Sequence, residues 1–273
     1  MKCSCLPRCR YYLILVLLAL LLAVFFQGSS FAAAEPELLL DINTGGDSDP
    51  SDLIELNYNL YFSADDHVHG EELWVSDGTA AGTQMVKDIS PGPDSSEPDD
   101  FIELDGYLYF EADDGSNGRE LWVSDGTAQG TQMVKDIRPG PGNSYPYQFI
   151  ELNGELYFQA NDGINGSELW VSDGTAQGTQ LVKDINTSGG SEPSEFIEYD
   201  SQLFFSAYDT THGEELWVTD GTAQGTQLVK DIRPGTDGSS LSGFIELDGQ
   251  LFFRASDGTN GSELWVSDGT AQG

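Results

Sequence analysis

Short apolar runs alternate with turn-forming residues along most of the chain. Residues 101–137 show the pattern clearly, with strand-forming runs at 101–104, 107–112, 120–124 and 132–137 separated by turns and loops rich in Asp, Asn and Gly. Asp105-Gly106 between two apolar runs favours a tight hairpin, because a two-residue turn needs positive φ. The pattern predicts four short antiparallel strands in a meander.

The third predicted strand carries large apolar side chains on both faces. Leu121 and Val123 point to one face and Trp122 to the other. A sheet packed between two neighbouring sheets has this pattern, whereas a half-solvated sheet alternates apolar with polar residues. No segment after the N-terminus has helical periodicity of useful length, so we expect an all-β protein.

The whole pattern repeats. Glu-Leu-Trp-Val-Ser/Thr-Asp-Gly-Thr surrounds each of the five tryptophans, and the spacings between them are 48, 48, 47 and 48 residues: Trp74, Trp122, Trp170, Trp217 and Trp265. A fixed period of this size indicates stacked supersecondary units. Four meandering strands followed by a longer Pro- and Gly-rich link predict a blade of a β-propeller.

The two ends of the repeat region are complementary in sequence. Residues 38–44 match 181–187, the fourth strand of a later copy, and Ile42 precedes Trp74 by 32 residues, as Ile185 precedes Trp217. The fifth copy stops at Gly273, before its own fourth strand. We therefore expect residues 35–273 to form a five-bladed β-propeller of four-stranded antiparallel blades, closed by the N-terminal strand. The alternative is a fragment of a longer array.

Residues 1–34 have the features of a secretory signal peptide. Lys2, Arg8 and Arg10 precede an apolar run at 11–26, and Ala32 to Ala34 fit a cleavage site before Glu35. The alternative is an uncleaved anchor, although the run is shorter than the ~20 residues of a usual membrane span. We expect export to the cell surface or the extracellular space.

Residues 35–273 are strongly acidic. They hold all 46 Asp and Glu residues but only eight Lys and Arg, a net charge of −38. This surface repels nucleic acid and anionic membranes, so we expect neither as a partner. Cys3, Cys5 and Cys9 all precede the apolar run, which excludes thiol chemistry and disulfides from the repeats.

The repeated residues Glu-Leu-Trp-Val-Ser/Thr-Asp-Gly-Thr, followed by Ala-x-Gly-Thr and Leu/Met-Val-Lys-Asp-Ile, resemble the ELWxxDGT tandem-repeat family of exported bacterial proteins. The match covers essentially all of residues 35–273. The resemblance implies an extracellular or surface β-repeat protein without an assigned activity, and it brings no catalytic residues to this chain.

An acidic loop before each Glu-Leu-Trp strand is a candidate calcium site. Each loop has the form Asp-x-x-x-Gly, and its aspartates are Asp66, Asp114, Asp162, Asp209 and Asp257. Calcium needs several oxygen ligands from a compact acidic loop. The alternative is structural, because Asp also shapes loops by accepting bonds from nearby backbone amides. The Asp-Gly-Thr aspartates, by contrast, are interpreted as turn residues: Asp77, Asp125, Asp173, Asp220 and Asp268.

One glutamate recurs on each first strand: Glu55, Glu103, Glu151, Glu198 and Glu246. In a closed ring these side chains would line the axial channel, where like charges raise pKa values or attract a cation. The alternative is that each carboxylate is satisfied locally. Lysines recur on each outermost strand, where they protect an edge, and the few loop histidines could bind zinc or be ordinary exposed residues: His67, His69 and His212.

No catalytic constellation stands out, and the sequence leaves three functions open. The first is a monomeric, non-enzymatic module that binds a glycan, a surface polymer or a protein, with Tyr145 and Tyr147 suited to sugar stacking. The second is a hydrolase, such as a glycoside hydrolase, that uses two axial carboxylates. The third is a structural component of a surface layer.

Overall fold

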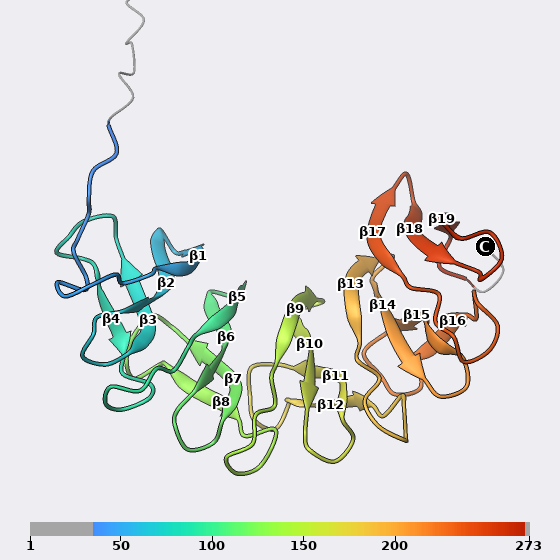
Figure 1. Cartoon of the computed structure of the whole chain (residues 1–273), viewed down its shortest axis with the longest axis horizontal. Coiled ribbons are helices and arrows are strands. Elements are labelled where there is room, and N and C mark those ends of the chain that lie inside the picture. Colours follow the sequence, from blue (N-terminus) through green and yellow to red (C-terminus); the bar gives the residue numbers. More distant parts are fainter. Residues whose placement is uncertain (1–34, 271–273) are drawn as a thin grey trace, which may run out of the picture. The chain divides into compact units, whose positions relative to one another are not determined.

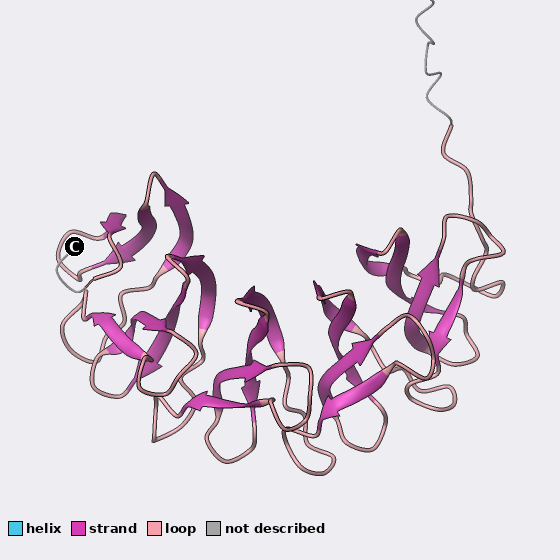
Figure 2. Cartoon of the chain, turned by 180° about the vertical axis from the view of Figure 1, so that it is seen from behind, coloured by secondary structure: helices cyan, strands magenta, loops and turns pink. Residues whose placement is uncertain are grey.

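The structure, a computed structural model, describes residues 35–270. The chain divides into two units, residues 1–38 and 39–273, and all nineteen strands belong to the second. Strands and loops make up the described residues, with no helix among them (Figures 1 and 2). The predicted signal peptide lies outside the described residues.

The strands form five antiparallel sheets in chain order. Four sheets have four strands each: β1 (Ser51–Leu56), β2 (Asn59–Asp65), β3 (Glu71–Ser76) and β4 (Gln84–Lys87); β5 (Asp99–Leu104), β6 (Tyr107–Asp113), β7 (Arg119–Ser124) and β8 (Gln132–Lys135); β9 (Tyr147–Leu152), β10 (Glu155–Asn161), β11 (Ser167–Ser172) and β12 (Gln180–Lys183); β13 (Ser194–Tyr199), β14 (Gln202–Asp209), β15 (Gly213–Thr219) and β16 (Gln227–Lys230). The fifth sheet has three: β17 (Ser242–Leu247), β18 (Gln250–Ser256) and β19 (Ser262–Ser267). The predicted four-stranded meander is confirmed in the first four copies.

The first hairpin of each sheet turns as its sequence predicts. Asp105 and Gly106 both have positive φ, 52° and 84°, as a two-residue turn between twisted strands requires. The departing copy Asn57-Tyr58 adopts the same conformation, with φ of 52° and 65°. The sheet therefore imposes this turn even on a tyrosine, a residue that does not favour positive φ.

Consecutive sheets pack face to face through one repeated apolar core. Leu73 and Val75 of β3 lie in a cluster with Phe110 and Trp122 of the next sheet, and equivalent clusters join the later sheets. Leu73 and Phe110 are completely buried. The prediction that both faces of the Glu-Leu-Trp strand are covered is thus confirmed for the three middle sheets, and burial of this kind is the main stabilising term.

A lysine links each of the first three sheets to the sheet that follows it. Lys87 lies over the Trp122 ring, 5.5 Å from its centroid, and its Nζ donates to the carbonyl of Thr131 at 2.7 Å. Lys135 and Lys183 make the same two contacts with the following sheets. The outer-strand lysines were interpreted as edge protection, but three of them bind a neighbouring sheet by a cation–π contact and a hydrogen bond.

The Asp-Gly-Thr segment is a hydrogen-bonded turn, as predicted. Asp125 Oδ1 accepts from the backbone N–H and the hydroxyl of Thr127, at 2.9 and 2.6 Å. The hydroxyl of Thr127 in turn accepts from the N–H of Gly130 at 3.0 Å. The bonds to the threonine recur in the other four copies, which accounts for the aspartate and the threonine of the motif.

The glycine of this turn also has to leave room for the preceding sheet. A Cβ atom on Gly174 would lie 2.3 Å from the hydroxyl of Tyr109 on β6, and Gly174 has a φ of 83°. Gly126 and Gly221 face Tyr61 and Tyr157 in the same way. The turn is therefore part of the contact between sheets.

The segment before β1 aligns with the fourth strand of a later copy, as expected. It does not form the expected strand pair with the last sheet. Ile42 packs against Phe62 and Trp74, as Ile89 packs in the cluster with Phe110 and Trp122. Residues 38–44, however, form no strand, and β19 pairs with β18 alone in the described residues. The predicted closure of the ring by this segment is not seen, and Leu38 is 80% exposed because no strand covers it.

Gly106 and Gly174 have nearly equal φ. Substituting each of them by alanine therefore distinguishes the cost of backbone strain from the cost of crowding between sheets. Gly106 (φ 84°) has open space around it, whereas Gly174 faces Tyr109. We expect Gly106→Ala to lower the free energy of unfolding by about 1 kcal/mol, and Gly174→Ala by about 2–4 kcal/mol because overpacking adds to the strain. Urea denaturation measures both.

The Tyr109→Phe background is the matched control for Gly174→Ala. Removing the hydroxyl takes away the atom nearest to the new Cβ. The cost of Gly174→Ala should fall toward that of Gly106→Ala, as a double-mutant cycle can measure. An unchanged cost in this background would contradict the contact.

Candidate functional site

The five acidic loops use their aspartates to hold their own backbone. Asp114 Oδ1 accepts from the N–H groups of Ser116 and Asn117, at 2.9 and 2.8 Å. Asp114 Oδ2 accepts from the side-chain amide of Asn117 at 2.8 Å. The other four loops are built in the same way, with His69 and His212 in place of the asparagine in two of them.

This geometry favours the loop-shaping interpretation over calcium. Both oxygens of each aspartate already accept hydrogen bonds, and these bonds lower the pKa of Asp162 although partial burial raises it. Within residues 35–270, no three His, Cys, Asp or Glu side chains come together in a group that could hold a metal ion. Calcium binding by Asp66, Asp114, Asp162, Asp209 and Asp257 stays a prediction.

Two of the three loop histidines, His69 and His212, pair with the same aspartates. His69 Nδ1 lies 2.7 Å from Asp66 Oδ2, and His212 Nδ1 lies 2.8 Å from Asp209 Oδ2. The hydrogen bond to the carboxylate raises the pKa of each histidine. These histidines therefore bond to the loop aspartate as asparagine does in the other loops, but their charge depends on pH.

The glutamates predicted for an axial channel are all exposed residues of the first strands. Glu103, Glu151 and Glu246 each accept a hydrogen bond from the turn glycine three residues later, at 2.7–2.8 Å. The alternative prediction from the sequence was that each carboxylate is hydrogen-bonded locally, and it describes these three glutamates. Glu198 and Glu246 border one surface hollow together with Tyr199, whose hydroxyl donates to the carbonyl of Gly249 at 2.8 Å.

A second set of glutamates is buried, and sequence reasoning gave it no role of its own. These are the glutamates of the first four Glu-Leu-Trp strands, all fully buried: Glu72, Glu120, Glu168 and Glu215. Glu120 Oε2 accepts from the N–H of Ile137 and the hydroxyl of Ser144, at 2.8 and 2.7 Å. Its Oε1 accepts from the N–H of Arg138 at 3.2 Å. Each carboxyl thus ties the third strand to the link that leaves the sheet.

Burial raises the pKa of Glu72, Glu120 and Glu168 to about 7, although the serine hydroxyls and backbone N–H groups that they accept from lower it. Burial likewise raises the pKa of Glu215. The sequence signal for these buried glutamates was one polar residue at the same position of each repeat, in an otherwise apolar strand. Perturbed pKa values mark functional sites in many proteins, but here the partners are structural serines and amides.

Three exposed apolar residues lie at the end of the sheets where the acidic loops and the links meet. Hydrogen bonds join these two kinds of segment, for example from the N–H of Arg119 to Asn143 Oδ1 at 3.1 Å. Val68 and Ile164 lie in the acidic loops and Tyr145 in a link, and all three are exposed, Ile164 by 87%. We call Val68, Tyr145 and Ile164 the link-side residues.

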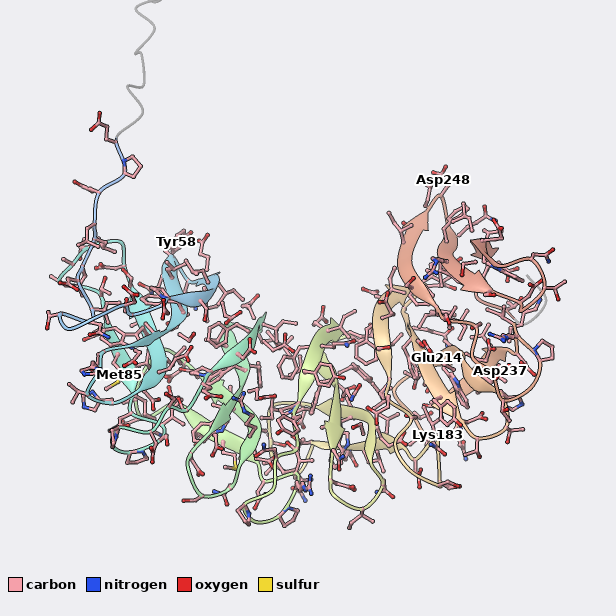
Figure 3. All side chains as sticks on the ribbon, in the orientation of Figure 1. Tyr58, Met85, Lys183, Glu214, Asp237 and Asp248 are labelled. Atoms are coloured by element: carbon pink, nitrogen blue, oxygen red, sulfur yellow. The ribbon has the colours of Figure 1, made fainter. Side chains whose placement is uncertain are left out.

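The hairpin turns form the opposite end of the sheets. Tyr58 lies at the tip of the β1–β2 hairpin and Asp248 at the tip of the β17–β18 hairpin (Figure 3). Tyr58 and Tyr107 are the exposed aromatic residues there. Tyr147, suggested from the sequence for sugar stacking, is half-buried on β9.

No family model matches the sequence, and no curated protein matches it. Among solved structures, puromycin hydrolase with a Ser-to-Ala substitution, bound to PGG, is 12% identical over 80% of this chain, with a TM-score of 0.50. The computationally designed Ika8 protein is 18% identical over 82% of the chain, with a TM-score of 0.46. A prolyl endopeptidase is 16% identical over 81%, with a TM-score of 0.49.

The fold is β-propeller-like. The five antiparallel sheets and the likeness to the puromycin hydrolase structure support this description. The chain spans 59% of the designed protein and 33–36% of the two hydrolytic enzymes. At these identities the likeness concerns the fold alone. No helix in the described residues has the length and apolarity to cross a membrane.

The buried glutamates predict a stability that falls as the pH rises. Their folded pKa of about 7 lies above the ordinary value of 4.5. The folded state therefore holds these protons more tightly, and this contribution to stability is fully present below pH 4.5 and lost as the pH rises through 7. We expect a higher Tm at pH 5 than at pH 8.

Glu120→Gln tests the assignment of this pH dependence. The amide does not titrate, so the change in stability between pH 5 and 8 should become smaller. Glu103→Gln, at an exposed site, is the control and should leave the slope unchanged. Equal slopes in the two variants would show that the buried carboxyls are not responsible.

The loop-shaping interpretation of the acidic loops predicts no stabilisation by calcium. Because their carboxylate oxygens are occupied by N–H donors, Tm in the presence of calcium should equal Tm in the presence of a chelator. Magnesium at equal ionic strength controls for the screening of the acidic surface. A rise of several degrees with calcium alone would support the calcium interpretation instead.

Proposed function

We propose that this protein is an exported, non-enzymatic binding module that recognises a neutral glycan or surface polymer through its link-side residues. One observation carries the proposal: the polar residues shared by the repeats are committed to the fold. The Asp-Gly-Thr aspartates cap turns, the loop aspartates hold their loops, and the buried glutamates hold the links. Recognition then falls to residues that differ between the repeats.

The link-side residues suit this role because they are apolar, exposed and variable. The position of Ile164 is held by Val68 in the first acidic loop and by Ser116 in the second. A tyrosine at position 145 offers a flat apolar face with a polar tip, which suits contact with a sugar ring. Differences of this kind favour one extended ligand over five equal sites.

The charge of the chain narrows the class of partner. Residues 35–273 carry a net charge of −38. Such a surface disfavours phosphate-rich polymers and anionic membranes, because both are repelled at physiological salt. A neutral or cationic polymer at the cell surface is compatible with this charge. A protein is the other class of partner that the proposal includes.

Export and family membership belong to the same proposal. The basic start, the apolar run and the small residues before Glu35 support a signal peptide. The repeated Glu-Leu-Trp-Val-Ser-Asp-Gly-Thr motif supports membership of the ELWxxDGT repeat family. The finer description of the fold, a five-bladed propeller, is supported by five sheets that share one pattern of packing.

A hydrolase is the second candidate, and one observation favours it. Glu198 and Glu246 border a common hollow with Tyr199 and Asp200, and glycoside hydrolysis needs two carboxyl groups about a sugar. Glu246, however, also accepts a hydrogen bond from Gly249. If this hollow were catalytic, Glu198→Gln would abolish sugar release from a panel of polysaccharides.

A glycan array with the full-length protein tests the binding proposal. The triple variant Val68→Ser, Tyr145→Ala and Ile164→Ser should lose at least tenfold in affinity for each glycan bound, because it removes the exposed apolar contacts. The variant should keep its Tm, since exposed substitutions change stability little.

The matched control is Tyr58→Ala with Tyr107→Ala, at the hairpin end. These tyrosines are also exposed, so the pair should bind like the unsubstituted protein. Loss of binding in this control, with none in the triple variant, would place recognition at the hairpin end. Release of sugar by the unsubstituted protein would favour the hydrolase.

A further inference from the structure

A row of polar side chains crosses each sheet near its link-side end, and its members differ from sheet to sheet. The row takes one residue from each of the first three strands. We call it the polar row. Its members are Ser51, Ser63 and Glu71 in the first sheet; Asp99, Glu111 and Arg119 in the second; Tyr147, Gln159 and Ser167 in the third; Ser194, Ser206 and Glu214 in the fourth; Ser242, Arg254 and Ser262 in the fifth.

In the first, fourth and fifth sheets the members of the polar row bond to one another. Ser63 Oγ donates to Glu71 Oε1 at 2.8 Å, and the matching serine and glutamate of the fourth sheet make the same bond at 2.7 Å. Arg254 Nη2 donates to Ser262 Oγ at 3.0 Å in the fifth sheet. These rows therefore use their polar groups within the sheet.

The polar row of the second sheet contains its own cation. Arg119 Nη1 donates to Glu111 Oε1 at 2.6 Å, and the same guanidinium forms an ion pair with Glu97 of the preceding link. Glu111 is only 7% exposed. A carboxylate at this depth needs a charged or hydrogen-bonding partner, and Arg119 supplies it.

The third sheet lacks this cation. Gln159 stands at the position of Glu111 and is 3% exposed. Its Nε2 donates to Glu192 Oε2 at 3.1 Å, and burial raises the pKa of Tyr147 while a side-chain hydrogen bond with Gln159 lowers it. Gln159 Oε1 is buried and has no hydrogen-bond partner among the described residues. A buried acceptor calls for a donor, and the sheet does not provide one.

Ser167 and Glu192 lie beside this unpaired acceptor. Ser167 stands at the position of Arg119, so the row has no basic side chain. The carbonyl of Ser167 accepts from the N–H of Glu192 at 3.0 Å. Glu192 Oε1 and the N of Ser167 both lie within 3 Å of the place that a Cβ on Gly190 would take. Glu192 is exposed, so the group of residues has a solvent-facing carboxylate and a buried amide oxygen.

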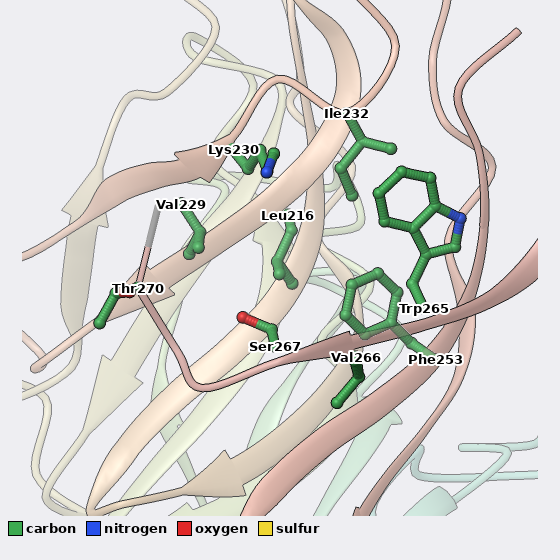
Figure 4. A pocket seen from close by; sticks show the side chains of 9 residues that line it. All are labelled: Leu216, Val229, Lys230, Ile232, Phe253, Trp265, Val266, Ser267 and Thr270. Carbon is green, nitrogen blue, oxygen red and sulfur yellow. The ribbon is translucent and has the colours of Figure 1, made fainter. Parts of the chain in front are cut away.

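Other unfilled or unpaired places in the structure lack this combination. A cavity of about 200 Å³ between the fourth and fifth sheets is lined mainly by apolar side chains, among them Leu216, Phe253 and Trp265 (Figure 4). Buried aspartate oxygens without a described partner recur in four successive repeats and so belong to the shared fold: Asp88, Asp136, Asp184 and Asp231. Gln159, in contrast, has no glutamine counterpart in the other polar rows.

We propose that the polar row of the third sheet, together with Glu192, binds an organic cation with N–H donors, either a guanidinium or a primary ammonium group. Its N–H groups donate to Gln159 Oε1 and to the carboxylate of Glu192, as the guanidinium of Arg119 does to two glutamates in the second sheet. Both groups offer donors and no acceptor, which matches a site made of oxygen acceptors. The net charge of −38 on residues 35–273 attracts such a ligand. The site goes beyond the glycan-binding proposal, because it needs none of the link-side residues.

Two small cations test the site on the full-length protein. Binding of ethylguanidinium and of ethylammonium is measured as saturable broadening of their NMR signals. Tetramethylammonium is the control, because it has the same charge but no N–H donor and should not bind. Saturable binding of ethylguanidinium alone assigns the site to guanidinium groups, and binding of ethylammonium assigns it to ammonium groups.

Three variants locate the binding. Gln159→Leu should weaken it at least tenfold, because the buried acceptor is lost. Ser167→Arg should abolish it, because the arginine of the second sheet is then copied into the site. Glu192→Gln, at an exposed position, should weaken it at least fivefold and leave Tm nearly unchanged. Asp248→Asn removes one charge at a distant hairpin tip and should leave binding unchanged.

The proposal is overturned if neither cation binds saturably, which would leave water as the donor to Gln159. Equal binding of tetramethylammonium, or an equal loss in Asp248→Asn and Glu192→Gln, would also overturn it, since attraction to the acidic surface would then explain the result. Val68, Tyr145 and Ile164 take no part in these measurements. The glycan-binding proposal is therefore unaffected by any of these outcomes.

Discussion

The contact between consecutive sheets is the interaction on which the structure depends. Leucine and valine from one third strand pack on phenylalanine and tryptophan of the next sheet, and three lysines hold adjacent sheets together from the outer strands. Four of the five apolar clusters in the described residues join two consecutive sheets, because a single layer of strands cannot bury both of its faces. Stability therefore belongs to pairs of neighbours, as expected for repeat proteins.

This constraint accounts for most of the repeated motif. The tryptophan and its flanking residues form the core, the lysine lies on the tryptophan, and the turn glycine makes room for a tyrosine of the preceding sheet. The buried glutamate fixes the link that carries the chain to the next sheet. Identity between repeats thus reflects the demands of stacking, and function has to be sought where repeats differ.

The acidity of the chain also takes on a clearer physical meaning. The repeat region has only eight basic residues, and three of them lie between sheets: Lys87, Lys135 and Lys183. Less positive charge is therefore left on the surface to offset the acidic residues. Like charges at the surface repel each other, and salt screens that repulsion. Charge of one sign at this density also opposes self-association of the chain.

The strands and turns could be predicted from the sequence, because they follow from local rules. Period-two apolar runs, Asp-Gly turns and the regular spacing of tryptophan predicted the meander, the type of each hairpin and the covering of both faces. The register of Ile42 and Asn43 was also readable, since it follows from alignment with Ile185 and Asn186.

The contacts between side chains of different sheets could not be predicted from the sequence and became visible in the folded chain. The lysine that looks like edge protection lies on a tryptophan 35 residues further along the chain in Lys87 and Trp122, and no local pattern encodes that distance. The role of Glu120 depends on the burial of its whole strand, and that of Glu103 on a turn glycine.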